Sequence, residues 1–103
     1  MAVLVTRWSG SHESPTISQM ESALEELRKP DAEHPDCWVS HENGWTVSVH
    51  ESGKIVLENV ETGEGPWHLM TKDFRFVLPL WEALQRGDVE EIKKHAWVNG
   101  YNA

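Results

Sequence analysis

The chain has 103 residues, of which 39% are hydrophobic and 25% are charged, as is typical of one soluble globular domain. We therefore expect a single domain over residues 1–103. The formal net charge of −8 disfavours direct binding to nucleic acid, because proteins with that function present a basic surface. Cys37 is the one cysteine and cannot form an intramolecular disulfide. With no apolar run long enough for a signal peptide or a membrane span, we expect a cytoplasmic location.

The negative charge is concentrated in one segment. Residues 31–64 contain eight acidic side chains and one basic side chain, Lys54, and therefore carry −7 of the net charge of −8. The flanking segments are nearly balanced. Because residues 31–64 should also form most of the sheet, the sequence predicts an acidic sheet surface suited to a basic partner.

The N-terminal segment predicts a strand followed by a helix. Residues 3–8 are apolar and β-branched, and Ser9-Gly10-Ser11 should end this strand. Ser14-Pro15 provides a capping residue before a proline at the first helical position. Thr16 and Ser18 are each followed three residues later by Gln or Glu, which is the spacing of a capping box. The apolar stripe of the helix should comprise Ile17, Met20, Leu24 and Leu27 before Pro30 stops it.

In the middle of the chain apolar and polar residues alternate, which is the period of β-strands. Two glycine-containing turns, Glu42-Asn43-Gly44 and Glu51-Ser52-Gly53, separate the strands. If each is a three-residue loop with its glycine in the left-handed region, Val47 lies opposite both Val39 and Leu57. Two-residue turns would instead place Val47 opposite polar residues, which is costly when one face is buried. We therefore predict three-residue loops.

The last third of the chain predicts a short strand and two helices. Trp67-His68-Leu69-Met70 should be an edge or closing strand, and Leu78-Pro79 should open a helix that ends at Gly87. Asp88 should start another short helix, and the aromatic tail from residue 97 should dock. The predicted fold is an α+β two-layer sandwich, with an antiparallel sheet of about four to five strands packed against an N-terminal helix and one or two C-terminal helices. The predicted core comprises Ile17, Met20, Leu24, Leu27, Trp45, Val47, Val49, Leu57, Leu80, Trp81 and Leu84.

A metal site is one alternative, because His34, Cys37 and His41 are three potential ligands within eight residues. The chain has no cysteine pair, and the predicted register turns Cys37 and His41 toward the apolar face, so we expect neither metal nor cofactor. The sequence also lacks a nucleophile motif and a phosphate-binding glycine loop. We expect a non-enzymatic protein, with a small metal-dependent or hydrolytic enzyme that uses these three residues as the alternative.

Two tryptophans are candidate anchors for a basic partner. Trp38 alternates away from the apolar face, and Trp67 follows a Gly-Pro turn near Glu61 and Glu64. An indole provides buried contact, while carboxylates steer and pair with Lys or Arg. In the competing interpretations, Trp38 packs beneath a helix and the acids are only solvated, or the edge of the Trp67 strand binds a peptide. The predicted partner-binding residues are Glu42, Glu51, Glu58, Glu61, Glu64, Trp38 and Trp67.

Three segments carry a resemblance to a known group of proteins. They are Thr16-Ile17-Ser18-Gln19-Met20-Glu21-Ser22-Ala23-Leu24-Glu25-Glu26-Leu27 after an opening strand, Gly44-Trp45-Thr46-Val47-Ser48-Val49, and Leu78-Pro79-Leu80-Trp81-Glu82-Ala83-Leu84 before Gly87-Asp88. In this organisation the chain resembles the small immunity proteins of bacterial polymorphic and contact-dependent toxin systems. The resemblance implies a non-enzymatic cytoplasmic protein that binds one cognate toxin, often a basic nuclease or deaminase. Such proteins share no universal binding residues, so the candidate residues above come from charge and turn position alone.

Overall fold

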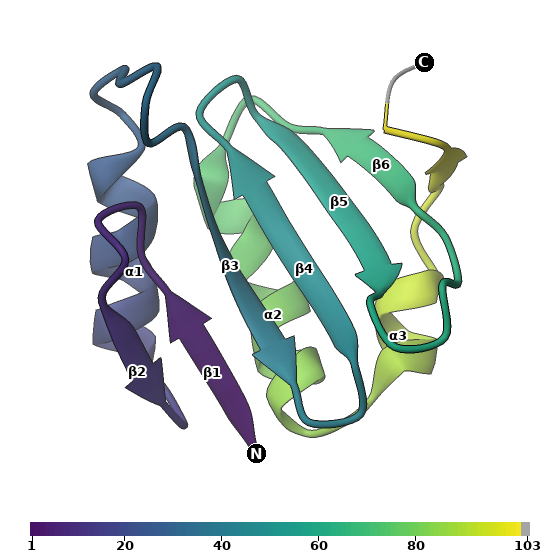
Figure 1. The fold of residues 1–103 in the computed structure, drawn as a ribbon. Coiled ribbons are helices and arrows are strands. Elements are labelled where there is room, and N and C mark those ends of the chain that lie inside the picture. The colour runs from purple at the N-terminus through teal and green to yellow at the C-terminus, as the bar shows by residue number, and fades with distance from the viewer. Residues whose placement is uncertain (102–103) are drawn as a thin grey trace.

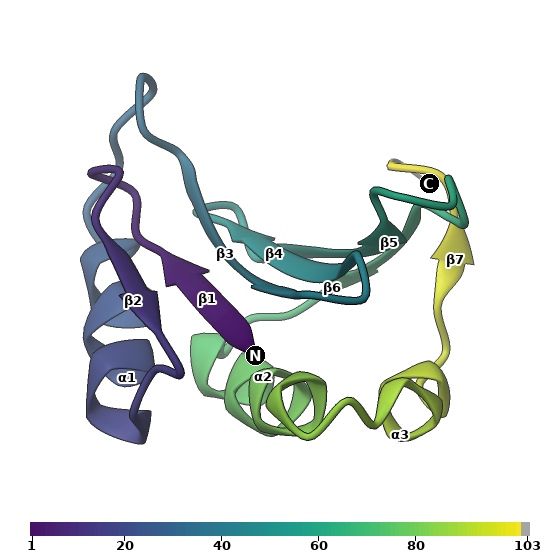
Figure 2. The ribbon, with the colours of Figure 1, turned by 60° about the horizontal axis from the view of Figure 1, so that its bottom comes forward.

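The computed structural model describes residues 1–101, in which seven strands form one antiparallel sheet and three α-helices pack against it (Figure 1). The strand order is β2-β1-β3-β4-β5-β6-β7. Figure 2 shows the helices together on one side, so no helix within residues 1–101 lies over the other face of the sheet. The strands are β1 (Ala2–Val5), β2 (Ser11–Glu13), β3 (Asp36–His41), β4 (Trp45–His50), β5 (Lys54–Asn59), β6 (Trp67–Met70) and β7 (Val98–Asn99). The helices are α1 (Ile17–Glu26), α2 (Val77–Gln85), α3 (Val89–Lys93) and a 3₁₀ turn, η1 (Phe74–Phe76).

The predicted α+β class is confirmed, but the prediction of four to five strands is wrong. The additional strands, β2 and β7, form the two edges of the sheet. β2 is a polar Ser-His-Glu segment and β7 has only two residues, so neither shows an alternating pattern. The first strand was predicted to run to Trp8 and to end at Ser9-Gly10-Ser11, but β1 ends at Val5. The chain reverses over residues 6–10, and Ser11 already belongs to β2, which pairs with β1. β2 therefore forms by a hairpin with the neighbouring β1, and β7 by pairing with the distant β6, in both cases without an alternating pattern of its own.

α1 begins at one of the two predicted capping boxes. The Thr16 hydroxyl accepts from the Gln19 backbone N–H at 3.1 Å, and the Gln19 side chain accepts from the Thr16 N–H at 2.9 Å. The helix buries Met20 and Leu24, as predicted. Ile17 was wrongly assigned to the core, since it is 54% exposed. It is the first residue of the helix and precedes the turns that pack against the sheet.

Both predicted three-residue loops are confirmed, and they set the register of the central hairpins. Val47 pairs with Val39 on one side and with Leu57 on the other. Gly44 and Gly53 have φ of +92° and +94°, values that glycine tolerates far better than other residues. A Cβ atom at Gly53 would also lie 2.1 Å from the Thr71 carbonyl oxygen. The turn chemistry therefore keeps the apolar side chains of three strands on one face.

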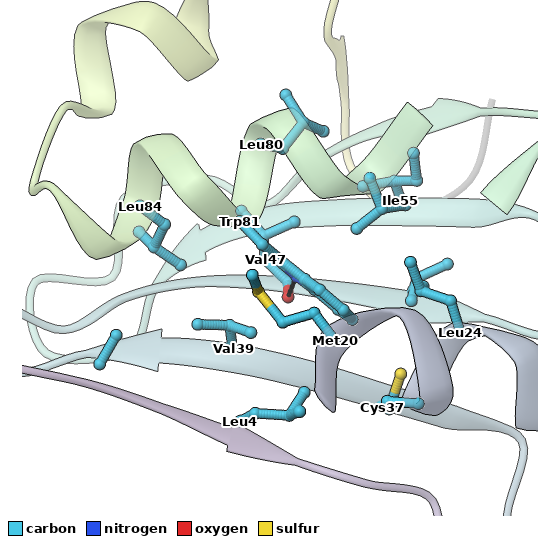
Figure 3. Close-up of a cluster of buried hydrophobic side chains, with 14 of the residues drawn as sticks. Leu4, Met20, Leu24, Cys37, Val39, Val47, Ile55, Leu80, Trp81 and Leu84 are labelled. Atoms are coloured by element: carbon cyan, nitrogen blue, oxygen red, sulfur yellow. Dashed lines mark hydrogen bonds between the residues drawn. The ribbon is translucent and has the colours of Figure 1, made fainter. Parts of the chain in front are cut away.

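The core lies between the helices and the covered face of the sheet (Figure 3). Trp81 of α2 is fully buried, and its indole N–H donates to the Val47 carbonyl at 2.9 Å. This bond satisfies the polar atom that a buried tryptophan brings with it. Within residues 1–101, no helix has the length and apolarity needed to cross a membrane. The other predicted core residues that are buried are Met20, Leu24, Leu27, Trp45, Val47, Val49, Leu57, Leu80 and Leu84.

Candidate partner-binding surface

The face of the sheet without a helix carries Trp38 near its middle. Its neighbours Cys37 and Val39 point into the core, so Trp38 points to the opposite face. Trp38 is half-buried. The interpretation in which Trp38 packs beneath a helix is wrong, because the helices lie on the other side of the sheet (Figure 2). It therefore lies on a surface that a partner can reach. The row of residues paired across the sheet through Trp38 is Val5, Trp38, Ser48, Val56, His68 and Val98.

The C-terminal tail docks on its own domain, beside β6. The Gly100 N–H donates to the Pro66 carbonyl at 2.8 Å, and the Gly100 carbonyl lies 2.7 Å from His68 Nδ1. Because a carbonyl only accepts, His68 Nδ1 must be the donor. The Tyr101 hydroxyl donates to Glu58 Oε2 at 2.7 Å, and this carboxylate raises the pKa of Tyr101. β7 therefore pairs with Trp67 and His68 at the strand edge considered above for peptide binding.

Four of the five predicted acidic residues gather at one end of the sheet, seen at the bottom of Figure 1. Two adjacent loops bring them there, since the Val60 N–H in the β5–β6 loop donates to the Gly44 carbonyl in the β3–β4 loop at 3.0 Å. We call this group the acidic end. It comprises Glu42, Glu58, Glu61 and Glu64.

Asn59, which is not among the predicted partner-binding residues, holds the two loops of the acidic end together. Its buried side-chain amide donates to the Asn43 carbonyl at 3.2 Å. Its side-chain oxygen accepts from the backbone N–H groups of Glu61 and Thr62 at 2.9 and 3.0 Å. The available signal in the sequence was an asparagine at the end of a predicted strand, because a side-chain amide needs hydrogen-bond partners where it is buried. The loop positions of the carboxylates are therefore set by a neutral side chain.

The carboxylates of the acidic end differ in whether they contact a positive charge. Glu42 contacts the N-terminal ammonium at 2.8 Å, and this hydrogen bond, followed by the ammonium charge, lowers the pKa of Glu42. Glu61 and Glu64 are exposed, and neither forms an ion pair with any residue that the structure describes. These two carboxylates are thus available to a cationic partner.

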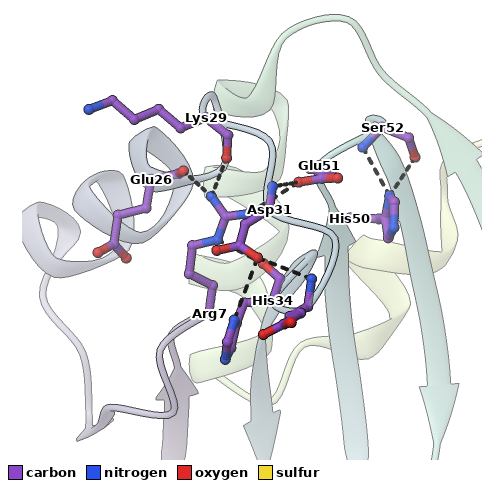
Figure 4. A network of polar contacts seen from close by, with 9 residues as sticks. Arg7, Glu26, Lys29, Asp31, His34, His50, Glu51 and Ser52 are labelled. Atoms are coloured by element: carbon purple, nitrogen blue, oxygen red, sulfur yellow. Dashed lines mark hydrogen bonds and ion pairs between the residues drawn. The ribbon is translucent and has the colours of Figure 1, made fainter.

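Glu51 lies apart from the other four acidic residues. It is in the β4–β5 turn at the opposite end of β4, roughly 17 Å along the strand from the acidic end. Its side chain is 20% exposed and accepts from the Arg7 guanidinium at 3.1 Å and from the Asp31 N–H at 2.8 Å (Figure 4). Glu51 therefore contributes to an internal polar network rather than to the acidic end.

Trp67 and Trp38 point to opposite faces of the sheet. Trp67 pairs with Leu57 and points to the helix side, where its ring lies 6.2 Å from that of Trp45 at 18° between the ring planes. The two predicted anchors therefore do not form one surface. Trp38 shares its face with Glu58, which lies two strands away. The two positions are separated by about 10 Å across the sheet and by about 7 Å along the strands.

His34, Cys37 and His41 do not converge. Cys37 is fully buried beneath the helices, and His41 lies four residues further along β3, about 13 Å away along the strand. His34 lies before β3 with its ring 4.9 Å from that of Trp8. Across residues 1–101, no three His, Cys, Asp or Glu side chains are placed to hold a metal ion. The geometry therefore disfavours the ligand set considered in the sequence.

A hollow of about 660 Å³ lies beside the C-terminal end of α1 and also shows no catalytic arrangement. Arg7, Trp8, Glu25 and Lys29 are among the residues that line it. The buried Arg7 side chain uses its donors on backbone carbonyls and Glu51, and none of the lining residues is a histidine or a cysteine. The hollow thus lacks a paired nucleophile and base.

Comparison of the chain with known protein families, curated proteins and solved structures finds no match.

Cys37 should be chemically inert in the folded protein. Burial, followed by the negative charges of Asp36 and Glu26, raises the pKa of the Cys37 thiol from 9.0 to about 12. Since the thiolate is the reactive form, we expect 5,5′-dithiobis(2-nitrobenzoate) at pH 8 to label the chain only in denaturant. Rapid stoichiometric labelling of the native protein would contradict this.

The same shift predicts an alkaline loss of stability. The neutral thiol contributes its full stability below about pH 9. Between pH 9 and 12 ionisation favours the unfolded chain, so stability falls. Cys37→Ala should remove this part of the pH dependence in urea unfolding curves.

Proposed function

We propose that this protein binds and neutralises a basic protein toxin, as the immunity proteins that it resembles do. The binding surface consists of the acidic end and the adjoining face of the sheet around Trp38. The protein performs no reaction itself, and it acts by covering a cationic cleft of the toxin, such as the cleft of a nuclease or deaminase.

The observation that carries this proposal is the gathering of carboxylates beside a sheet face without a helix. Glu61 and Glu64 are exposed without cationic partners among residues 1–101, and Glu58 places a further carboxylate on the face of Trp38. A negative surface of this kind raises the rate of encounter with a positive one. The half-buried indole of Trp38 provides apolar contact on the same face as Glu58.

The proposal is tested by affinity capture from the organism that produces the chain. Tagged protein is incubated with lysate at low salt, and bound material is eluted with rising salt. We expect one basic polypeptide to elute as the salt screens the acidic end, and to lose a toxic activity when the purified protein is added back. Failure to recover a basic polypeptide, or recovery of one that keeps its activity in the complex, would refute the proposal.

A further inference from the structure

The ammonium group of Lys93 lies on two tryptophan rings. Its Nζ atom is 4.8 Å from the ring centroid of Trp45 and 6.0 Å from that of Trp67. These distances fall within the range of attraction between a cation and the negative face of an aromatic ring. The rings come from β4 and β6, and Lys93 comes from α3, which Figure 1 shows behind the end of β5.

The backbone conformation of Gly65 and the side chain of Trp97 shape this site. Gly65 has φ of +86°, and a Cβ atom there would come within 3.0 Å of the Trp67 ring, so glycine allows the ring to lie where it does. Trp67 and Lys93 line a hollow of about 410 Å³, and Trp97 borders this hollow too. Its indole N–H donates to the Ile92 carbonyl at 2.8 Å and fixes it to the end of α3. We call the site formed by Trp45, Trp67 and this hollow the indole site.

Lys93 and Lys94 differ in the contacts that stabilise their positive charges. Lys94 forms an ion pair with Glu91 at 2.9 Å. Lys93 forms no ion pair with any residue in the described part of the chain, so the indole rings are its only charge-stabilising contacts there. The protein thus places one of its own cations in a site that suits cations.

We propose that the indole site is a cation-binding site that Lys93 occupies from within the chain, and that its ligand is a lysine or arginine side chain of the partner. The identity of that ligand rests on the proposed function, whereas the affinity of the site for a cation does not. Trp45 pairs with Asn59, which leads directly into the loop that carries Glu61 and Glu64. A basic side chain attracted to these carboxylates therefore arrives next to the indole site.

Removal of Lys93 should make the site available to a small cation. In Lys93→Ala, tetramethylammonium chloride should change tryptophan fluorescence saturably, with an apparent affinity at least about tenfold higher than in the unmodified protein. The unmodified protein should respond weakly, because its tethered ammonium competes at a high effective concentration. Lys94→Ala is the matched control, since it removes the same charge one residue away and should behave as the unmodified protein does.

Two further measurements separate a cation site from an apolar gap. Tert-butanol has nearly the same shape as tetramethylammonium without the charge, and it should bind Lys93→Ala much more weakly. Adding Trp67→Leu to Lys93→Ala should abolish the response to tetramethylammonium. Equal responses in the Lys93 and Lys94 variants, or equal binding of the neutral and charged probes, would overturn the proposal.

Folding and partner identity are checked separately. Lys93→Gln keeps the aliphatic stem over the rings and serves as the test variant if circular dichroism shows that Lys93→Ala is unfolded. A positive tetramethylammonium result together with failed capture of a basic polypeptide would retain the indole site and reject its assignment to a toxin side chain. A negative result with successful capture would reject the indole site and leave the proposed function standing.

Discussion

Reversing Glu61 and Glu64 to lysine is expected to slow association with the basic partner about 100-fold at low ionic strength. The two side chains are exposed, and neither is paired with a cation in the part of the chain that the structure describes. Each substitution replaces an attractive charge by a repulsive one at the proposed partner-binding surface. Stopped-flow tryptophan fluorescence measures the association rate directly.

Salt dependence distinguishes steering from lost contacts. At about 0.5 M salt the Debye length falls to roughly 4 Å, so the rates of the variant and the unmodified protein should converge. The matched control is Glu21→Lys with Glu90→Lys, which changes the net charge equally on exposed positions of α1 and α3. Equal slowing by both pairs would show that total charge, not the acidic end, governs association.

Replacing Arg7 by methionine should destabilise the fold by about 3–5 kcal/mol. The Arg7 side chain is 1% exposed and donates through Nε to the His34 carbonyl at 2.8 Å. Nη1 donates to the carbonyls of Glu26 and Lys29, and Nη2 donates to Glu51 at 3.1 Å. Figure 4 shows these groups converging on one guanidinium. Methionine fills similar space but leaves the carbonyls and the carboxylate without this donor.

The control for Arg7 is another arginine with an ion pair on the surface. The Arg75 side chain is 77% exposed and contacts Asp73 at 3.2 Å, so Arg75→Met should leave the free energy of unfolding nearly unchanged. Arg7→Lys should lie between the two, because an ammonium cannot reproduce the planar set of donors. Urea unfolding at neutral pH measures all three. Similar losses in Arg7→Met and Arg75→Met would refute the structural role of Arg7.

The hairpins show how far local sequence determines the fold. Gly44 and Gly53 permit the left-handed turn conformation, and only one register then places Val47 opposite apolar neighbours. The capping box of Thr16 and Gln19 likewise acts over four residues. These features depend on contacts between near neighbours in the chain, so they could be predicted from the sequence.

The candidate site was less predictable because its members meet through long-range packing. Regional charge indicated that residues 31–64 carry the acids, but not that Glu51 would lie at the far end of the sheet. Trp67 looked like a surface residue next to a turn, whereas its pairing with Leu57 turns it toward Trp45. Its face depends on the conformation of a loop that has no simple periodic signal.

By itself, the sequence determined the α+β class, the central register and the concentration of negative charge in one segment. Only the tertiary structure decided which acids share an end, that β2 and β7 complete the sheet, and that Lys93 lies on the tryptophan pair. The physical reason is how far apart in the chain the contacting residues lie. Turn conformations and side-chain alternation follow from a few adjacent residues, whereas the β6–β7 pairing and the ring–cation contacts arise when segments distant in the chain are brought together by a common core.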